Sequence, residues 1–166
     1  MGTLLTAAAI AASADPPLGG GEYAPRMAAD TECLFCKMVA GDLPGTIIDS
    51  DELTVSFMDI YPVTRGHALV VPRNHSRDLH EIGTEDLAAV TLAAQRLAAR
   101  ARGADGINLT NFCGPAAWQT VFHFHLHMIP RYDHDPLRLP WLPGPGDPDE
   151  IAAAAELLKS AHDAEA

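Results

Sequence analysis

The stretch Val121-Phe122-His123-Phe124-His125-Leu126-His127-Met128-Ile129 decides the fold of this 166-residue chain. Three histidines alternate with bulky apolar residues, and this alternation predicts a β-strand. Successive side chains of a strand point to opposite faces, so the histidines are expected on one face, about 6–7 Å from neighbour to neighbour. The apolar residues between them are expected to pack against a core: Phe122, Phe124, Leu126 and Met128.

The alternation indicates a functional strand rather than a purely structural one, because each buried imidazole needs a hydrogen-bond partner. Imidazoles in this arrangement fit a metal site, a nucleophilic site, or one of each. A single metal held by all three is sterically excluded. Neighbours ~6–7 Å apart on one strand cannot all reach an ion at about 2.0–2.1 Å.

The stretch resembles the signature of the histidine triad (HIT) nucleotide hydrolases and transferases, in which His-x-His-x-His is followed by two apolar residues. Gln119-Thr120-Val121 before it and Pro130-Arg131 after it are similar to the family as well. Upstream, Phe57-Met58-Asp59-Ile60 and Gly66-His67-Ala68-Leu69-Val70-Val71-Pro72 lie at the usual distances. Several motifs in the right order make the resemblance specific.

The resemblance covers about residues 31–131, which are expected to form one HIT domain. Residues 1–30 are expected to form a flexible N-terminal extension, and residues 132–166 a Pro-rich segment with a terminal helix. Short strands joined by turns, with one long helix, predict an antiparallel α+β sheet. The family implies five strands, one long and one short helix, and pairing into a two-fold dimer.

The expected elements follow from composition and turn signals. Asp30 or Thr31 is expected to cap the short helix, and Gly41 to end it. The predicted ranges are a short helix over 33–40, strands over 46–48, 53–57, 67–71 and 107–110, a long helix from 84 to about 102 that ends at Gly103, and a terminal helix from 147 to about 162.

Composition limits the classes of partner. The formal net charge of −11 argues against nucleic-acid binding, which depends on Lys and Arg neutralising phosphates. The sequence has no apolar run of about 18 residues, so no membrane span is expected. Three cysteines do not suggest a disulfide framework. The expected partners are a purine nucleotide substrate and a second copy of the chain, with a cytoplasmic location.

Cys33-x-x-Cys36 by itself fits a metal knuckle, a redox pair or two core thiols. A redox pair is expected in a βαβ setting, which this sequence lacks. His75 lies just past a predicted strand, and His123 begins the triad. The family resemblance implies that these two cysteines and two histidines bind Zn²⁺ in a closed Cys2His2 site, whose role is structural. The alternative is a reduced pair of cysteines without metal.

The remaining two histidines of the triad carry the chemistry that the resemblance implies. His125 is expected to attack the α-phosphorus of a nucleotide, forming a nucleotidyl-histidine that water then cleaves. His127 is expected to hydrogen-bond the phosphate or the bridging atom and to help the leaving group depart. Gln119 and Thr120 are expected to hold the non-bridging oxygens.

Nucleotide binding is assigned by the same resemblance. Asp59 is similar to the family's ribose-binding carboxylate, and His67 to a position near the α-phosphate. An apolar slot for the base fits the neighbouring residues. The expected nucleotide-binding set is Phe57, Met58, Asp59, Ile60, His67, Asn111, Gln119, Thr120, His125 and His127, with Asn111 one residue away from the family's spacing.

Trp118 departs from the family, which usually has glycine at this position. Glycine lets the backbone approach a phosphate closely, and a tryptophan does not. Trp118 is expected to cover the site or to stack on a leaving group.

Three functions remain open. The leading one is hydrolysis of nucleoside phosphoramidates or related nucleotidyl conjugates at the α-phosphate. The second is a dinucleoside polyphosphate hydrolase or phosphorylase, since Gly114-Pro115-Ala116-Ala117 is similar to the loop of that branch of the family. The third, from another class, is a nucleotide-binding sensor or scaffold with low turnover.

Overall fold

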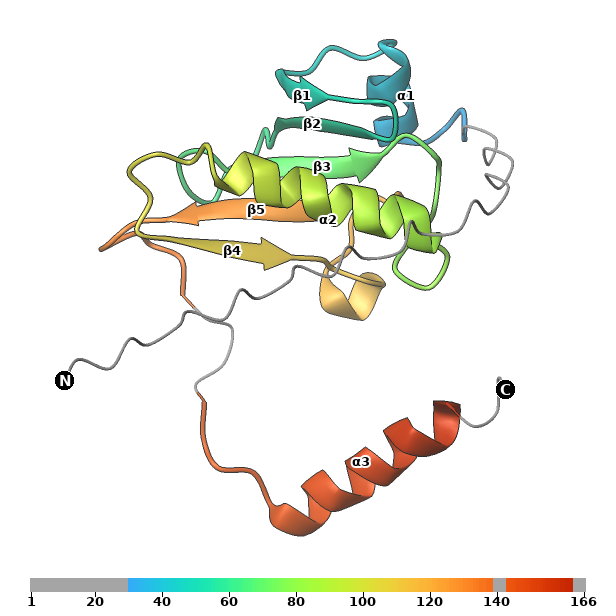
Figure 1. Ribbon diagram of the computed structural model, residues 1–166, viewed down its shortest axis with the longest axis vertical. Helices are drawn as coiled ribbons and strands as arrows, with labels where there is room; N and C mark the ends of the chain where they lie inside the picture. The colour runs from blue at the N-terminus through green and yellow to red at the C-terminus, as the bar shows by residue number, and fades with distance from the viewer. Residues whose placement is uncertain (1–29, 139–142, 163–166) are drawn as a thin grey trace, which may run out of the picture.

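A five-stranded antiparallel sheet with two packed helices forms the body of the protein (Figure 1). The computed structural model describes residues 30–138 and 143–162, so nearly all of the predicted N-terminal extension lies outside the described residues. The elements in chain order are α1 (Leu34–Ala40), β1 (Ile47–Ser50), β2 (Thr54–Met58), β3 (Ala68–Pro72), α2 (Thr84–Ala98), β4 (Gly106–Thr110), the 3-10 turn η1 (Pro115–Ala117), β5 (Leu126–Arg131) and α3 (Pro148–His162).

The strand order is β1-β2-β3-β5-β4, with every neighbouring pair antiparallel. This confirms the predicted antiparallel α+β sheet, its five strands, and its long and short helices. Strand β3 lies at the centre, and all five of its residues are buried. It has to be apolar on both faces, which explains the uninterrupted run Ala68-Leu69-Val70-Val71.

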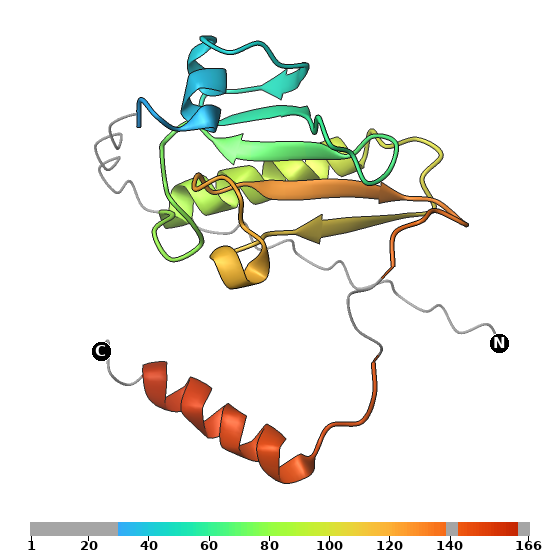
Figure 2. The ribbon, with the colours of Figure 1, turned by 180° about the vertical axis from the view of Figure 1, so that it is seen from behind.

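The two faces of the sheet bury separate apolar clusters, because β3 side chains alternate between them. Helix α2 covers one face (Figures 1 and 2) and buries a cluster that includes Val90, Val70, Phe124 and Met128. Helix α1 covers part of the other face, where the second cluster contains Cys33, Phe35, Cys36, Val55, Phe57, Leu69 and Val71. The predicted cysteine pair therefore lies in a dry environment.

The N-cap of helix α1 lies two to three residues later than expected. Cys33 is the N-cap, and its Sγ accepts the backbone N–H of Cys36 at 3.4 Å. The prediction of Asp30 or Thr31 as the cap is wrong, because the carbonyl of Asp30 instead accepts the backbone N–H of Cys33 at 3.1 Å. Gly41 ends the helix as predicted, with φ 86° in the left-handed region.

The histidine strand is shorter than predicted. β5 begins at Leu126, residues 121–123 form bends, and residues 124–125 have no regular secondary structure. The backbone N–H of Phe124 donates to the carbonyl of Ser76 at 2.6 Å instead of joining a strand ladder. Phe124 and Met128 are buried beneath α2 as expected. Phe122 is not, since it is 38% exposed and stacks under the guanidinium of Arg77.

Helix α3 confirms the predicted terminal helix and stands apart from the sheet in both views (Figures 1 and 2). Its apolar residues Ile151, Leu157 and Leu158 are exposed. Among the described residues, no helix has the length and apolar content needed to cross a membrane.

Candidate active site and metal centre

Four predicted metal ligands meet at one end of the sheet. Helix α1 supplies Cys33 and Cys36, His75 follows β3, and His123 lies just before β5. Their ligand atoms all lie within 4.8 Å of one another. The Sγ atom of Cys36 is 3.3 Å from Nδ1 of His75 and 3.5 Å from Nδ1 of His123. A tetrahedral Zn²⁺ site separates sulfur and nitrogen ligands by about 3.6 Å, so the spacing fits.

His123 presents the correct nitrogen to this cluster. Its Nε2–H donates to the carbonyl of Pro72 at 3.0 Å, which leaves the lone pair of Nδ1 toward the two sulfur atoms. The residue is completely buried. Burial lowers its pKa to about 4, so the imidazole is neutral and able to act as a ligand near pH 7.

Cys36 needs a cation to ionise in this environment. Burial is the main cause that raises the pKa of the Cys36 thiol to about 11, with Cys33 adding to it. A bound divalent ion reverses this effect, because its charge favours the thiolate. Two sulfurs and two neutral imidazoles at tetrahedral spacing form a donor set suited to Zn²⁺.

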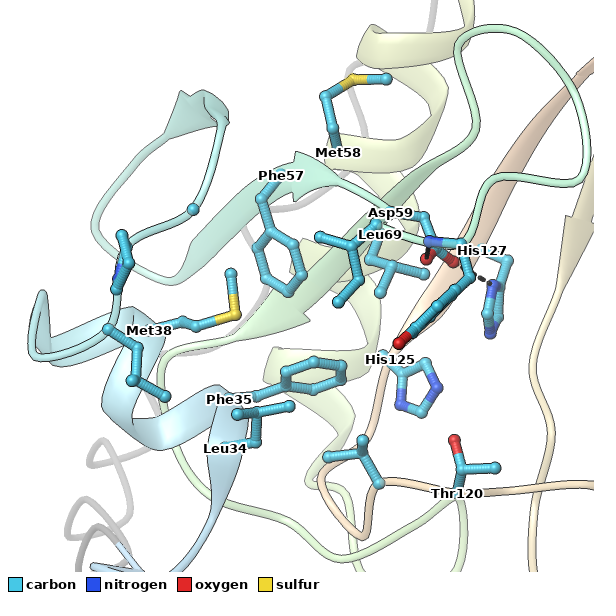
Figure 3. Close-up of a pocket in the computed structure, with 16 residues that line it drawn as sticks. Leu34, Phe35, Met38, Phe57, Met58, Asp59, Leu69, Thr120, His125 and His127 are labelled. Atoms are coloured by element: carbon cyan, nitrogen blue, oxygen red, sulfur yellow. Dashed lines mark hydrogen bonds and ion pairs between the residues drawn. The ribbon is translucent and has the colours of Figure 1, made fainter.

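His125 lies at the edge of a cavity of about 460 Å³ (Figure 3). Its Nδ1–H donates to the carbonyl of His123 at 2.7 Å. The ring of Phe35 packs edge-on against it, with ring centroids 5.2 Å apart. Burial lowers the pKa of His125. The imidazole is therefore neutral and fixed in one tautomer, with the Nε2 lone pair available for attack.

His127 is held by a chain of hydrogen bonds that starts in the loop before β3. The backbone N–H of Val63 donates to Nδ1 of His67 at 3.3 Å, so the proton of the neutral His67 ring is on Nε2. That Nε2–H donates to Nδ1 of His127 at 2.9 Å. The remaining proton of His127 is therefore on Nε2, which is buried and has no hydrogen-bond partner.

Asp59 lies beside this pair. Its Oδ2 is 3.4 Å from Nε2 of His67 and 4.0 Å from Nδ1 of His127, and its Oδ1 accepts the backbone N–H of Tyr61 at 2.8 Å. Asp59, His67 and His127 are also close enough to share a metal ion. The tautomer of His67 opposes this, because a ligating Nε2 requires the proton on Nδ1, which faces the Val63 N–H donor.

The cavity is apolar at one end and polar at the other. Phe57 and Leu69 point into it from β2 and β3, Phe35 from α1, and Asp59, His125 and His127 form the polar end (Figure 3). Thr120 and the 78%-exposed Ile60 complete its rim. A planar apolar group fits the first end and a hydroxylated, anionic group the second.

Three predicted site residues make contacts beyond those expected. Met58 lines the cavity, and its side chain also packs against the cluster beneath α2. The side-chain amide of Gln119 is satisfied within the chain, accepting the N–H of Gly114 and donating to the carbonyls of Arg77 and Val121.

The third is Asn111, which donates to the carbonyl of His125 at 2.9 Å and does not line the cavity.

Sequence reasoning missed several residues that line the cavity, among them Leu69 and Phe35, and also one backbone donor. Phe35 lines the cavity and touches the His125 ring, and its place between the cysteines of the Cys-x-x-Cys pair was the available signal. The backbone amide of Val63 sets the tautomer of His67. No side-chain pattern reports a backbone donor, so this role had no signal in the sequence.

Comparisons with known proteins find related sequences and structures. A family model described as HIT domain matches residues 40–134. The adenosine 5′-monophosphoramidase hnt1 of Schizosaccharomyces pombe is 36% identical over 129 residues, which cover 77% of this chain and 96% of that protein.

Two solved structures are similar as well. A Zn-bound histidine triad family protein from Mycobacterium smegmatis superposes with a TM-score of 0.61 at 41% identity, covering 78% of this chain and 97% of the other. A histidine triad nucleotide-binding protein from Candida albicans gives a TM-score of 0.68 at 29% identity, covering 81% and 99%.

Proposed function

The chain belongs to the HIT family, and on that premise we propose that it hydrolyses nucleoside phosphoramidates or related nucleotidyl conjugates at the α-phosphate. The observation that carries the proposal is the opposite proton arrangement of two adjacent imidazoles. His125 presents a lone pair to the cavity, and His127 presents an unpartnered N–H. A nucleophile and a donor, with ring centroids 5.0 Å apart, suit a displacement at phosphorus.

In the first step, Nε2 of His125 forms a bond to the α-phosphorus as the bond from phosphorus to the leaving nitrogen breaks. The electron pair of that bond goes to the departing nitrogen, which takes the proton from Nε2 of His127. His125 becomes positively charged, and its Nδ1–H stays on the carbonyl of His123. That positive charge balances the charge left on the neighbouring His127 ring.

In the second step, water attacks the nucleotidyl-histidine. The water oxygen bonds to phosphorus, the bond to Nε2 of His125 breaks, and the released proton returns to Nε2 of His127. The products are a nucleoside monophosphate and the free amine. Each residue regains its starting protonation state, which turnover requires.

The nucleoside occupies the cavity that His125 and His127 line. The Asp59 carboxylate accepts the ribose hydroxyls, and the base lies between apolar side chains such as Phe57 and Leu69. The cavity volume of about 460 Å³ suits one nucleoside. A purine base remains a prediction from the family resemblance.

We propose Zn²⁺ for the cluster of Cys33, Cys36, His75 and His123. The ion supplies structural cross-linking of α1 to the sheet when bound, because a closed four-ligand site has no open position for catalysis. The ring of His123 is then fixed, and its carbonyl is fixed with it. The two-fold dimer and the cytoplasmic location remain predictions.

The test is a substrate panel measured with the full chain. Adenosine 5′-phosphoramidate, aminoacyl-AMP and diadenosine polyphosphates are compared, with and without inorganic phosphate. The expected result is fast release of AMP from the phosphoramidate that does not depend on inorganic phosphate. Turnover of the dinucleotides alone would assign a dinucleoside polyphosphate hydrolase or phosphorylase. Tight nucleotide binding without turnover of any substrate would assign a sensor or scaffold.

A further inference from the structure

Beyond His127 lies a second and larger cavity, of about 710 Å³. It opens over the β4 and β5 side of the sheet face that α1 leaves uncovered, where Asn108, Thr110, Ile129 and Arg131 line its base. The nucleoside cavity and this one meet at a ring contact, since His127 lines the first and Phe112 the second. The centroids of these two rings are 5.1 Å apart.

This position relates the second cavity to the reaction. A substrate with its phosphorus in front of His125 extends in two directions, and the nucleoside takes the cavity that contains Asp59. Nε2 of His127 is buried and has no hydrogen-bond partner, so in the proposed mechanism His127 marks the point where the leaving group departs. The leaving group therefore extends past the His127 ring toward Phe112.

The wall of this cavity is aromatic. Trp118 packs edge-on against Phe112 with ring centroids 6.1 Å apart, and the indole remains 65% exposed. Its backbone has φ 70°, a left-handed conformation that is strained for any residue other than glycine. Strained conformations persist at binding sites where the side chain is needed. The exposed indole of Trp118 on the cavity wall is therefore available to contact a ligand.

The two arginines that line the cavity differ in whether a carboxylate neutralises their charge. Arg131 is paired in a bidentate manner with Asp135, at 2.7 and 2.8 Å, so its charge is neutralised. Arg138 donates to the backbone carbonyls of Asp135 and Leu137. Within the described part of the chain Arg138 pairs with no carboxylate, so a positive charge remains at this rim.

We propose that Trp118 and Phe112 form a subsite for an aromatic ring in the leaving group, which makes Trp118 a specificity-determining residue. This inference rests on the proposed function. The ring can come from an aromatic amine or from the base of a second nucleotide. The second source adds phosphates, which Arg138 favours.

The test compares two amines of equal length and similar basicity. Adenosine 5′-phosphoramidates of 2-phenylethylamine and 2-cyclohexylethylamine are measured beside the unsubstituted phosphoramidate. For the wild type, kcat/KM for the phenyl compound is expected to exceed that of the cyclohexyl compound by about threefold to tenfold, the range that one aromatic contact contributes. Trp118→Leu is expected to bring this ratio near one, and Trp118→Phe to retain it.

Two further variants complete the set. Phe122→Leu also removes an exposed aromatic ring from this segment, but Phe122 lines neither cavity, so this variant is expected to keep the wild-type ratio. Trp118→Gly provides a ring-free variant without backbone strain if Trp118→Leu does not fold.

A ratio near one in the wild type, or a high ratio that persists without the Trp118 ring, would overturn this inference alone, provided the unsubstituted phosphoramidate is hydrolysed. A cavity filled by another part of the chain or by a second copy would give that result. Failure to hydrolyse any of the three compounds would overturn the proposed function and this inference together.

A second arm identifies the source of the ring. Diadenosine triphosphate and the phenylethyl compound are compared in the wild type and in Arg138→Gln. Slower cleavage of the dinucleotide alone assigns the ring to a second nucleotide, and unchanged rates for both assign it to an aromatic amine. Equal slowing of both compounds would contradict the role given to the charge.

Discussion

The backbone carbonyl of His123 accepts the Nδ1–H of His125 at 2.7 Å, while the ring of the same His123 lies 3.5 Å from two cysteine sulfurs. His123 is therefore both a ligand of the proposed zinc site and the hydrogen-bond acceptor of the proposed nucleophile, His125. A movement of its ring shifts the acceptor that sets the tautomer of His125. The proposed zinc site is therefore expected to affect catalysis through this single residue, although no ligand position is left for a substrate.

Removal of one sulfur ligand tests that coupling. Cys36→Ser is expected to empty the site and to lower kcat, because the carbonyl of His123 is no longer held in place. Metal analysis should find about one zinc per wild-type chain and far less in the variant. Cys113→Ser, which replaces the cysteine outside the cluster, serves as the control and should retain the metal. A metal-free wild type of equal stability would contradict the zinc assignment.

His67 is a positioning residue for His127. His67→Ala removes the donor that keeps the proton of His127 on Nε2, so kcat is expected to fall roughly 100-fold with little change in KM. His67→Gln offers an amide N–H at a similar place and should recover part of the rate. If both variants lose the same activity, or if KM alone changes, the hydrogen-bond chain from Val63 is not what orients His127.

The stability of the protein is expected to decrease on acidification. Burial, followed by the nearby His125 and His67, lowers the pKa of His127 to about 4 from the ordinary 6.5. Between these values the unfolded chain binds a proton that the folded chain does not, so the free energy of unfolding falls as pH decreases. His127 is expected to contribute on the order of 1–3 kcal/mol to this change. Urea unfolding from pH 4 to pH 7 measures it.

The matched variant for this experiment is His127→Asn, which has no titrating group at this position. Other groups, including the metal ligands, titrate in both proteins, so the difference between the two curves isolates His127. The wild-type curve should rise more steeply toward pH 6.5. Parallel curves would show that His127 is not held neutral by the fold.

Two phenylalanines of the histidine segment are expected to differ in stability effect. Phe124 is 1% exposed beneath α2, and Phe124→Ala should reduce the free energy of unfolding by about 3–5 kcal/mol. Phe122 is 38% exposed, and Phe122→Ala should cost less than about 1 kcal/mol. Urea unfolding of both variants provides the comparison. Similar losses would mean that Phe122 is also packed in a core, as strict alternation predicts.

Phe122 and Phe124 show how much of the fold can be predicted from the sequence. Alternation correctly places Phe124 and Met128 against a core, because side-chain direction follows from backbone geometry. It fails at Phe122, where the chain bends before β5 and the backbone N–H of Phe124 bonds to Ser76 instead of to a strand. A long-range backbone bond of this kind leaves no periodic signal in a single sequence.

The candidate site shows a similar division. Residue types and family motifs predict which side chains meet, and the four sulfur and imidazole ligands do meet. They do not predict the hydrogen-bond partners of each side chain. The amide of Gln119 bonds to two backbone groups of its own loop and to the distant carbonyl of Arg77, and Asn111 bonds to the carbonyl of His125. These partners depend on loop conformations that only the assembled fold determines.

The central claim is that Nε2 of His125 forms a bond to phosphorus during turnover. Intact mass measured after brief exposure to an adenosine phosphoramidate, followed by peptide mapping, tests it most directly. The account predicts one adenylyl group on His125 that disappears as AMP is released, and no adduct in His125→Asn. Turnover at the wild-type rate by His125→Asn, or an adduct located on another residue, would contradict the account.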